Sequence, residues 1–300
     1  MGINNVNEFA ETNFFEGRLY MEFTDSHCHL DNDVFTEQLP ALLNQCRQLA
    51  IKRIIIPSIS PANFDSVLAL PKKYPYAKNQ VLLSPCLGIH PWFLDGLTDT
   101  HLDLLSAKAK QERANIIAIG ETGLDGAIAK KSPEHGQSTE QNWAHQTVFF
   151  DFQLNLAKEQ KLPVIIHHRQ SHDKILPLLK KYKLERSGII HGFSGSYQQA
   201  KSYLDLGFKL GIGSTITYPR AKKTINTIKR LPLTSLVLET DAPSMPLSRE
   251  AGGAVGEPNS PINIMNIFTA LQEIREENAA TIAMQVEENV NSVFFSRQPI

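Results

Sequence analysis

Leu162-Pro-Val-Ile-Ile-His167 is a short apolar run that ends in a histidine. Its β-branched residues and nearly continuous apolar character are typical of a parallel strand that is buried on both faces. Similar runs recur along the chain and predict eight strands. The predicted strands are 22–26, 52–57, 81–88, 115–120, 162–166, 187–190, 207–212 and 235–239.

Amphipathic segments separate these runs. Apolar residues fall at helical spacing in several of them, and Ser260 and Pro261 are suited to the N-cap and first position of a helix. The predicted helices are 36–50, 139–160, 171–183, 196–206, 219–230, 261–275 and 279–294. The glycine-rich segment 248–260 predicts a mobile loop after the last strand.

Alternating strands and helices predict a TIM (β/α)8 barrel. A doubly wound open sheet is the structural alternative, but no Gly-x-Gly-x-x-Gly turn follows the first predicted strand. The 300 residues suit one barrel domain over residues 21–300, preceded by an appendage at residues 1–20.

The composition indicates a globular protein with a sizeable core. The chain is 42% hydrophobic and has a formal net charge of −1, so bulk charge does not suggest coating of nucleic acid, although a local basic patch stays open. The three cysteines are far apart, and no apolar run approaches the roughly 20 residues that span a bilayer. We therefore expect a soluble, cytoplasmic protein without disulfides.

Candidate metal ligands follow five of the predicted strands. Barrel enzymes place their active sites at the C-terminal ends of the strands, where residues distant in sequence converge. His-x-His on a strand also places both imidazoles on one side. The six residues are His27, His29, Glu121, His167, His191 and Asp241.

Each of these residues alone has an ordinary explanation, such as a hydrogen-bonded histidine, a helix cap or a turn. Together, four imidazoles and two carboxylates exceed the needs of one tetrahedral ion and favour two divalent cations. Mixed nitrogen and oxygen ligands suit Zn, Mn, Fe, Co or Ni, and Mg less well.

The economical assignment gives Glu121 as a bridge between two cations. His27, His29 and Asp241 would hold one cation, and His167 and His191 the other. Two cations could acidify a shared water and bind the oxygens of an attacked ester, and Asp241 could take the proton of that water. Glu121 and Asp241 are therefore the predicted catalytic residues.

Seven motifs resemble those of the TatD-like metal-dependent deoxyribonucleases, in order along the chain. They are Asp25-Ser-His-Cys-His29-Leu-Asp31, Gly88-Ile-His-Pro91, Ile119-Gly-Glu-Thr-Gly-Leu-Asp125, Pro163-Val-Ile-Ile-His-His-Arg169, His191-Gly-Phe-Ser-Gly195, Gly213-Ser-Thr-Ile-Thr-Tyr-Pro219 and Leu238-Glu-Thr-Asp-Ala-Pro243. The resemblance implies an amidohydrolase-type TIM barrel, divalent metals held at the same six positions, and hydrolysis of DNA phosphodiester bonds. It also implies DNA as the partner, as single strands or ends.

The chain departs from this family at three positions. Gly126 stands where an aromatic residue is common, Gln170 where many members carry an acidic residue, and Ser260 in a loop that often bears Arg before its Pro. These departures concern substrate preference. A small-molecule amidohydrolase, lactonase or phosphotriesterase is the enzymatic alternative, and a degenerate barrel kept as a binding module would be expected to lack ligands.

Candidate substrate contacts lie on the predicted loops around the same rim. Arg169 follows His167 by two residues and could clamp a phosphate or form a structural ion pair. His90 and Trp92 could line the pocket or stack a base, and packing is the alternative for Trp92. The other predicted contacts are Ser194, Thr215, Tyr218 and Arg220, with a basic cluster formed by Arg220, Lys222, Lys223, Lys229 and Arg230. A solvated helix face is the usual explanation of such a cluster. His168 and Cys28 are predicted to point away from the site.

Overall fold

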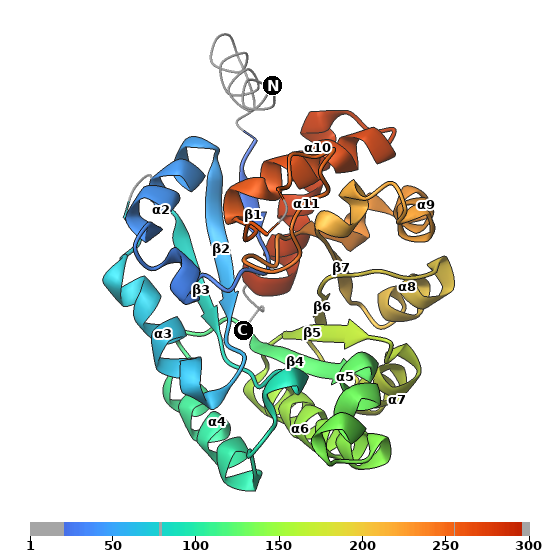
Figure 1. Ribbon diagram of the computed structural model, residues 1–300. Coiled ribbons are helices and arrows are strands. Elements are labelled where there is room, and N and C mark those ends of the chain that lie inside the picture. The colour runs from blue at the N-terminus through green and yellow to red at the C-terminus, as the bar shows by residue number, and fades with distance from the viewer. Residues whose placement is uncertain (1–20, 78–79, 255, 296–300) are drawn as a thin grey trace.

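The computed structural model describes residues 21–295 except 78–79 and 255, so the predicted appendage at 1–20 lies outside the described residues. Strands occupy the centre of the molecule and helices surround them (Figure 1). The strands are β1 Phe23–Asp25, β2 Ile51–Pro57, β3 Leu82–Cys86, β4 Ile119–Asp125, β5 Val164–Arg169, β6 Gly188–Ile190, β7 Lys209–Ile212 and β8 Leu236–Leu238.

All neighbouring strands pair in parallel and in chain order. One ladder runs β1-β2-β3 and the other β4-β5-β6-β7-β8. Two single bridges join the ladders at both edges, Leu87 with Ile119 and Cys28 with Ala242. The eight strands therefore form a closed ring, and the predicted TIM barrel is confirmed.

The outer helices agree with the prediction in most places. They are α2 Leu39–Gln48, α3 Phe64–Lys73, α4 Asp99–Gln111, α5 Gly126–Lys131, α6 Thr139–Gln160, α7 His172–Tyr182, α8 Tyr197–Leu204, α9 Lys222–Arg230, α10 Ile264–Ile274 and α11 Ala279–Val290. The bounds of α6 match the prediction, and Ser138 with Gln141 forms a capping box at its start. Helices α3, α4 and α5 were not predicted. Within the described ranges, none of these helices has the length and apolar character to span a bilayer.

Two predicted strand ends were wrong. Strand β4 continues through Glu121 to Asp125, and β5 continues through His167 to Arg169, whereas the prediction ended both before these residues. The apolar run marks only the part of each strand that lies in the core. Backbone pairing continues beyond it, with Gly123 opposite His167. The polar ends of the strands belong to the ladder through this backbone pairing, and every second side chain there projects into the barrel mouth.

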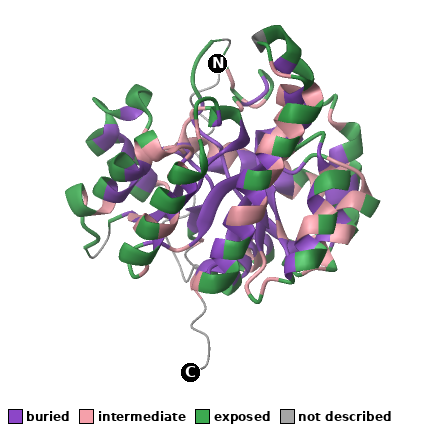
Figure 2. Ribbon diagram, turned by 90° about the horizontal axis from the view of Figure 1, so that it is seen from below, coloured by how far each residue is buried: buried purple, intermediate pink, exposed green. Residues whose placement is uncertain are grey.

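The part of the barrel interior away from the C-terminal ends of the strands is apolar. Figure 2 shows the buried strands at the centre, with the exposed faces on the outer helices. The inward residues of this layer pack against the segment that follows α11, a π-helical turn at Asn291–Phe295. The inward residues are Ile55, Cys86, Ala118, Ile165, Ile189 and Val237, and the residues near the end of α11 and in the turn that pack against them are Val290, Val293 and Phe294. Cys28, Cys46 and Cys86 are free, buried thiols.

A buried ion pair attaches this C-terminal segment to the strands. Arg53 on β2 donates to Glu287 on α11 at 2.5 Å and to Asn291 at 2.6 Å. Thr24 on β1 donates to the same Glu287 oxygen at 3.0 Å. Both ionic side chains are about one-tenth exposed, so removing one partner leaves the other charge buried.

We predict that Arg53→Ala lowers the free energy of unfolding by about 3–5 kcal/mol, because Glu287 would then be buried without its counter-charge. Denaturant unfolding measures the change. Lys52→Ala is the matched control, since Lys52 forms an exposed ion pair with Glu22, and its loss should cost less than about 1 kcal/mol. Equal effects of the two substitutions would contradict this role for Arg53.

Candidate metal centre

The candidate metal ligands lie next to the apolar layer of the barrel interior, toward the C-terminal ends of the strands. On β5 the inward Ile165 is followed two residues later by His167, and on β6 Ile189 is followed by His191. Because side chains alternate with a period of two, the same face that packs the core lower down carries imidazoles at the mouth. Asp241 follows β8 on the same alternation.

Four donor atoms form the first group at this mouth. His27 Nε2 lies 3.2 Å from His29 Nε2, and each of these nitrogens lies 3.4 Å from Asp241 Oδ1. Glu121 Oε2 lies 3.1 Å from His27 Nε2 and 3.4 Å from His29 Nε2. Ligands about 2.0 Å from a tetrahedral cation lie about 3.3 Å apart, so this group has the spacing of a four-donor metal site.

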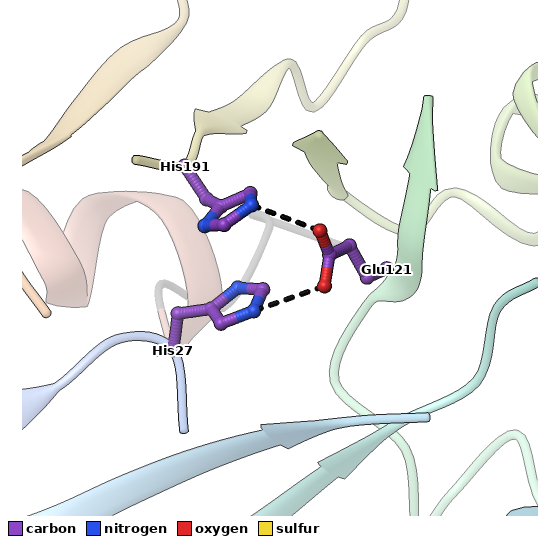
Figure 3. A group of neighbouring side chains, drawn as sticks. All are labelled: His27, Glu121 and His191. Atoms are coloured by element: carbon purple, nitrogen blue, oxygen red, sulfur yellow. Dashed lines mark ion pairs between the residues drawn. The ribbon is translucent and has the colours of Figure 1, made fainter. Parts of the chain in front are cut away.

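A second group meets the other oxygen of the same carboxylate. Glu121 Oε1 lies 2.8 Å from His191 Nε2, 3.1 Å from His167 Nδ1 and 3.2 Å from His90 Nε2. Figure 3 shows Glu121 reaching from β4 toward His27 and His191, each opposite a different oxygen. The structure therefore brings all six predicted ligands together, with Glu121 between the two groups.

Oxygen atoms on the far side of three imidazoles favour the tautomers that a metal needs. A ring nitrogen that donates to oxygen leaves the lone pair on the other nitrogen, which here faces the cluster. Two such hydrogen-bonded pairs are His29 Nδ1 with the Pro57 carbonyl at 3.3 Å and His167 Nε2 with Asp125 Oδ2 at 3.0 Å, while His191 Nδ1 faces Glu239 Oε1 at 3.5 Å without a hydrogen bond. The donor set and its orientation fit a divalent cation.

His90 has the opposite arrangement. Its Nδ1 accepts from the Trp92 backbone N–H at 3.0 Å, so in the neutral ring the hydrogen is on Nε2 and is donated to Glu121. Burial lowers the pKa of His90 to about 4, which keeps the ring neutral at physiological pH. His90 was predicted as a substrate contact, whereas the structure places it, buried, against Glu121.

Sequence reasoning missed Asp125 and Glu239 as members of the site. Both are fully buried, and Glu239 also accepts from the backbone N–H of Gly192. A signal existed, because Asp125 lies four residues after Glu121 and Glu239 two residues before Asp241. Residues separated by two or four positions on a strand project to the same side.

Opposite charges perturb the titration of the cluster in the absence of metal. Burial opposes protonation of His29, but hydrogen bonds to Asp241 and Glu121 raise its pKa to about 10. Burial likewise opposes protonation of His191, but the Glu121 charge raises its pKa well above the ordinary value. Despite burial, the surrounding imidazoles keep the pKa of Glu121 well below its usual range. These shifts favour protonated His29 and His191 beside an ionised Glu121 in the absence of metal, and a bound cation would displace those protons.

Two backbone features bring Glu121 and Asp241 into place. A Cβ atom at Gly88 would lie 2.5 Å from the Gly120 backbone, so only glycine permits this approach of β3 to β4. Asp241 adopts a left-handed conformation with φ of 57°, which aspartate tolerates better than most residues. Its backbone N–H donates to the His27 carbonyl at 2.8 Å, which ties the two ends of the barrel chain together.

The remaining predicted contacts lie around the rim. Arg169 is exposed at the end of β5, and its guanidinium has no hydrogen-bond or ion-pair partner among the described residues. Ser194 is also exposed. The Tyr218 hydroxyl donates to the Pro246 carbonyl at 2.8 Å, and the exposed Arg220 lies over the Tyr218 ring at 5.0 Å.

The predicted basic cluster is divided by helix α9. Lys222 and Lys223 begin the helix, whereas Lys229 and Arg230 end it. A rise of 1.5 Å per residue separates the two ends by about 12 Å along the axis. At the end of the helix, Arg230 lies over the ring of Tyr197, which begins α8, at 4.2 Å. His168, as predicted, points away from the cluster and packs between Phe193 and Tyr203.

A TIM barrel with buried histidine and carboxylate groups at its C-terminal mouth defines the class of metal-dependent hydrolases. Comparison with known families agrees: residues 24–295 match the model described as TatD related DNase, and the chain belongs to this family.

Individual relatives are consistent with this assignment. The chain is 42% identical over 272 residues to the uncharacterized metal-dependent hydrolase YjjV of Escherichia coli, covering 91% of this chain and 97% of that protein. The crystal structure of YjjV superposes with a TM-score of 0.82 and 40% identity, covering 92% and 99% of the two chains. The human deoxyribonuclease TATDN3 is 29% identical over 229 residues, which cover 74% and 78%.

We predict that the metal-free protein loses stability as the pH rises from about 6.5 to about 10. A pKa of His29 that is raised on folding stabilises the protein fully below the unfolded value, and this contribution disappears as the pH passes the folded value. The buried Asp25, whose desolvation raises its pKa to about 8, acts in the same direction. Urea midpoints of chelator-treated protein measure the effect.

His29→Gln should flatten this pH dependence, whereas His145→Gln on α6, outside the cluster, should not. A wild-type midpoint that stayed constant or rose over this pH range would refute the assigned charge states.

Proposed function

We propose that this protein hydrolyses phosphodiester bonds of DNA with the help of two divalent cations. The observation that carries the proposal is the position of Glu121, whose two oxygens face separate groups of donor atoms. One cation would be held by His27, His29, Asp241 and Glu121 Oε2. The other would be held by Glu121 Oε1, His167 and His191. When bound, the pair would acidify water and bind the oxygens of the attacked ester.

The protein's own groups suggest how the reaction is organised. Asp241 Oδ1 faces the first donor group, while its Oδ2 has no hydrogen bond within the described part of the chain. Oδ2 is therefore the atom we assign to accept a proton from the attacking water. Asp125 holds His167 in orientation through a hydrogen bond, Glu239 lies against His191 at 3.5 Å, and His90 donates to Glu121.

Arg169 is the proposed phosphate anchor. It stands two residues beyond His167 on the inward alternation of β5, and its guanidinium is not used in an ion pair with a described residue. A structural ion pair with a ligand carboxylate, the alternative from sequence, is not observed. A planar guanidinium matches the oxygens of a phosphodiester in a bidentate manner.

The choice of DNA as substrate is supported by the family and by relatives such as TATDN3, whose name states that activity. The same cations would activate water against a lactone or a phosphotriester, so small esters must be assayed beside DNA. The proposed metals are Zn, Mn, Mg, Ni or Co.

Metal stoichiometry tests the bridging role. Glu121→Gln should lower the binding affinity for both cations by at least about tenfold, because it removes the charge that they share. Asp241→Asn should lower the affinity for only one of them. Equilibrium dialysis followed by elemental analysis measures this without an activity assay. Glu288→Gln, an exposed carboxylate on α11, is the control and should retain two cations. Retention of two cations at wild-type affinity by Glu121→Gln would eliminate the bridge.

DNA hydrolysis tests the substrate and the anchor. Metal-reconstituted protein should degrade end-labelled single-stranded DNA, and Arg169→Ala should lower kcat/KM about 10- to 100-fold with metal content intact, through loss of a charge-assisted hydrogen bond. Arg47→Ala, an exposed arginine on α2, is the control. Hydrolysis confined to small esters and lactones would overturn the proposed substrate, and unchanged activity of Arg169→Ala would remove the anchor.

A further inference from the structure

Two large aromatic side chains are exposed beside the metal centre. Trp92 is 47% exposed and Phe93 43%, and both belong to a short 3-10 turn, Pro91–Phe93, that follows β3 at the mouth of the barrel. The Trp92 ring centroid lies 6.1 Å from that of His167 and 5.4 Å from that of His90. An exposed indole at this distance from the cluster is within reach of any substrate bound there.

The Trp92 ring is held in one orientation. Its Nε1 donates to Asp125 Oδ2 at 2.6 Å, and the same oxygen lies 3.0 Å from His167 Nε2. The other Asp125 oxygen accepts two backbone N–H groups at the start of α5. The carboxylate that orients His167 therefore also fixes the indole. Simple packing does not explain a tryptophan whose polar end is anchored while about half of the residue faces solvent.

Space for a planar group exists next to this ring. A hollow of about 410 Å³ is bounded by Trp92 and Phe93 on one side and by Pro61 and Ala62 on the other. This volume is within the range of small-molecule sites. The lining is largely apolar and is completed by Leu97 and by three polar residues, Ser60, Asp95 and His101. The apolar lining beside the indole suits the face of a heterocycle.

We propose that Trp92 is the stacking platform for the nucleobase next to the phosphate that is cleaved. The inference rests on the proposed hydrolysis of DNA and names the residue that selects unpaired nucleotides. A base within a duplex has both faces covered by its neighbours, whereas a base at a single-stranded end can place one face on the indole. Because Asp125 already fixes the ring, stacking requires little further loss of side-chain entropy.

A thermodynamic cycle tests this role by combining substitution of Trp92 with removal of the base from the substrate. The rate kcat/KM is measured on a single-stranded oligonucleotide and on the same oligonucleotide lacking the base beside the scissile phosphate. In the wild type, removal of the base should lower kcat/KM by between about 5- and 150-fold, the range of base–aromatic stacking. In Trp92→Ala the two substrates should react at similar rates. General effects on the metal centre cancel in this ratio, and elemental analysis reports metal content separately.

Two further variants separate stacking from the hydrogen bond to Asp125. Trp92→Phe keeps an aromatic face and loses the N–H donor, so it should retain most of the preference for the intact base. Trp143→Phe changes the other tryptophan of the chain, on α6, and should behave as wild type.

The possible failures are distinguishable. Absence of DNA cleavage by the metal-loaded wild type would refute the proposed function. Cleavage with an unchanged base preference in Trp92→Ala would refute the platform alone. Loss of that preference in both Trp92→Ala and Trp92→Phe would assign the effect to positioning through Asp125 and would also overturn stacking.

Discussion

The site depends on one buried carboxylate that is shared between two clusters of imidazoles. Glu121 is 2% exposed, and histidine nitrogens approach both of its oxygens. Moving a carboxylate out of water is unfavourable unless positive charge or hydrogen bonds surround it. The raised pKa values of His29 and His191 favour protonated imidazoles around it in the absence of metal, and cations could take their place because the donor atoms already converge. Most other features of the barrel mouth can be understood as conditions for keeping Glu121 in this position.

Backbone contacts between neighbouring strands also help to hold Glu121 and its surroundings in position. Ser58 after β2 exchanges hydrogen bonds with both backbone polar groups of Gly88 after β3, and its carbonyl accepts from the Glu121 N–H at 2.9 Å. Glycine is required at Gly88 by the close approach to the Gly120 backbone, and at Gly211 a Cβ atom would overlap the present position of the Glu239 carboxylate. Neither glycine contacts a candidate cation position. Gly88 lets the backbone before Glu121 approach β3, and Gly211 leaves room for the Glu239 carboxylate.

Much of this arrangement could be predicted from sequence, because apolar runs identify buried strands and strand ends must converge in a barrel. The six candidate ligands were found in this way. Asp125 and Glu239 were missed because each lies on the same strand as a more conspicuous ligand and contacts an imidazole rather than a cation position. The position of His90 could not be predicted, since it depends on a short turn after β3 and on which ring nitrogen that turn's backbone engages. Such details follow from tertiary contacts that periodicity does not encode.

The donor atoms at the barrel mouth do not by themselves identify the substrate. Two cations held by imidazoles and carboxylates can activate water against many esters, so the donor atoms define the chemistry and leave the substrate open. Substrate selectivity must then come from side chains that lie outside the set of donor atoms but are positioned by hydrogen bonds to residues of the site. Asp125 makes this connection, because one of its oxygens serves both His167 inside the barrel and Trp92 at its edge. A substrate that displaced the indole would disturb a candidate ligand, whereas one that stacks on it would leave the centre intact. The rim can therefore favour planar, unpaired groups without any change in the residues that perform hydrolysis.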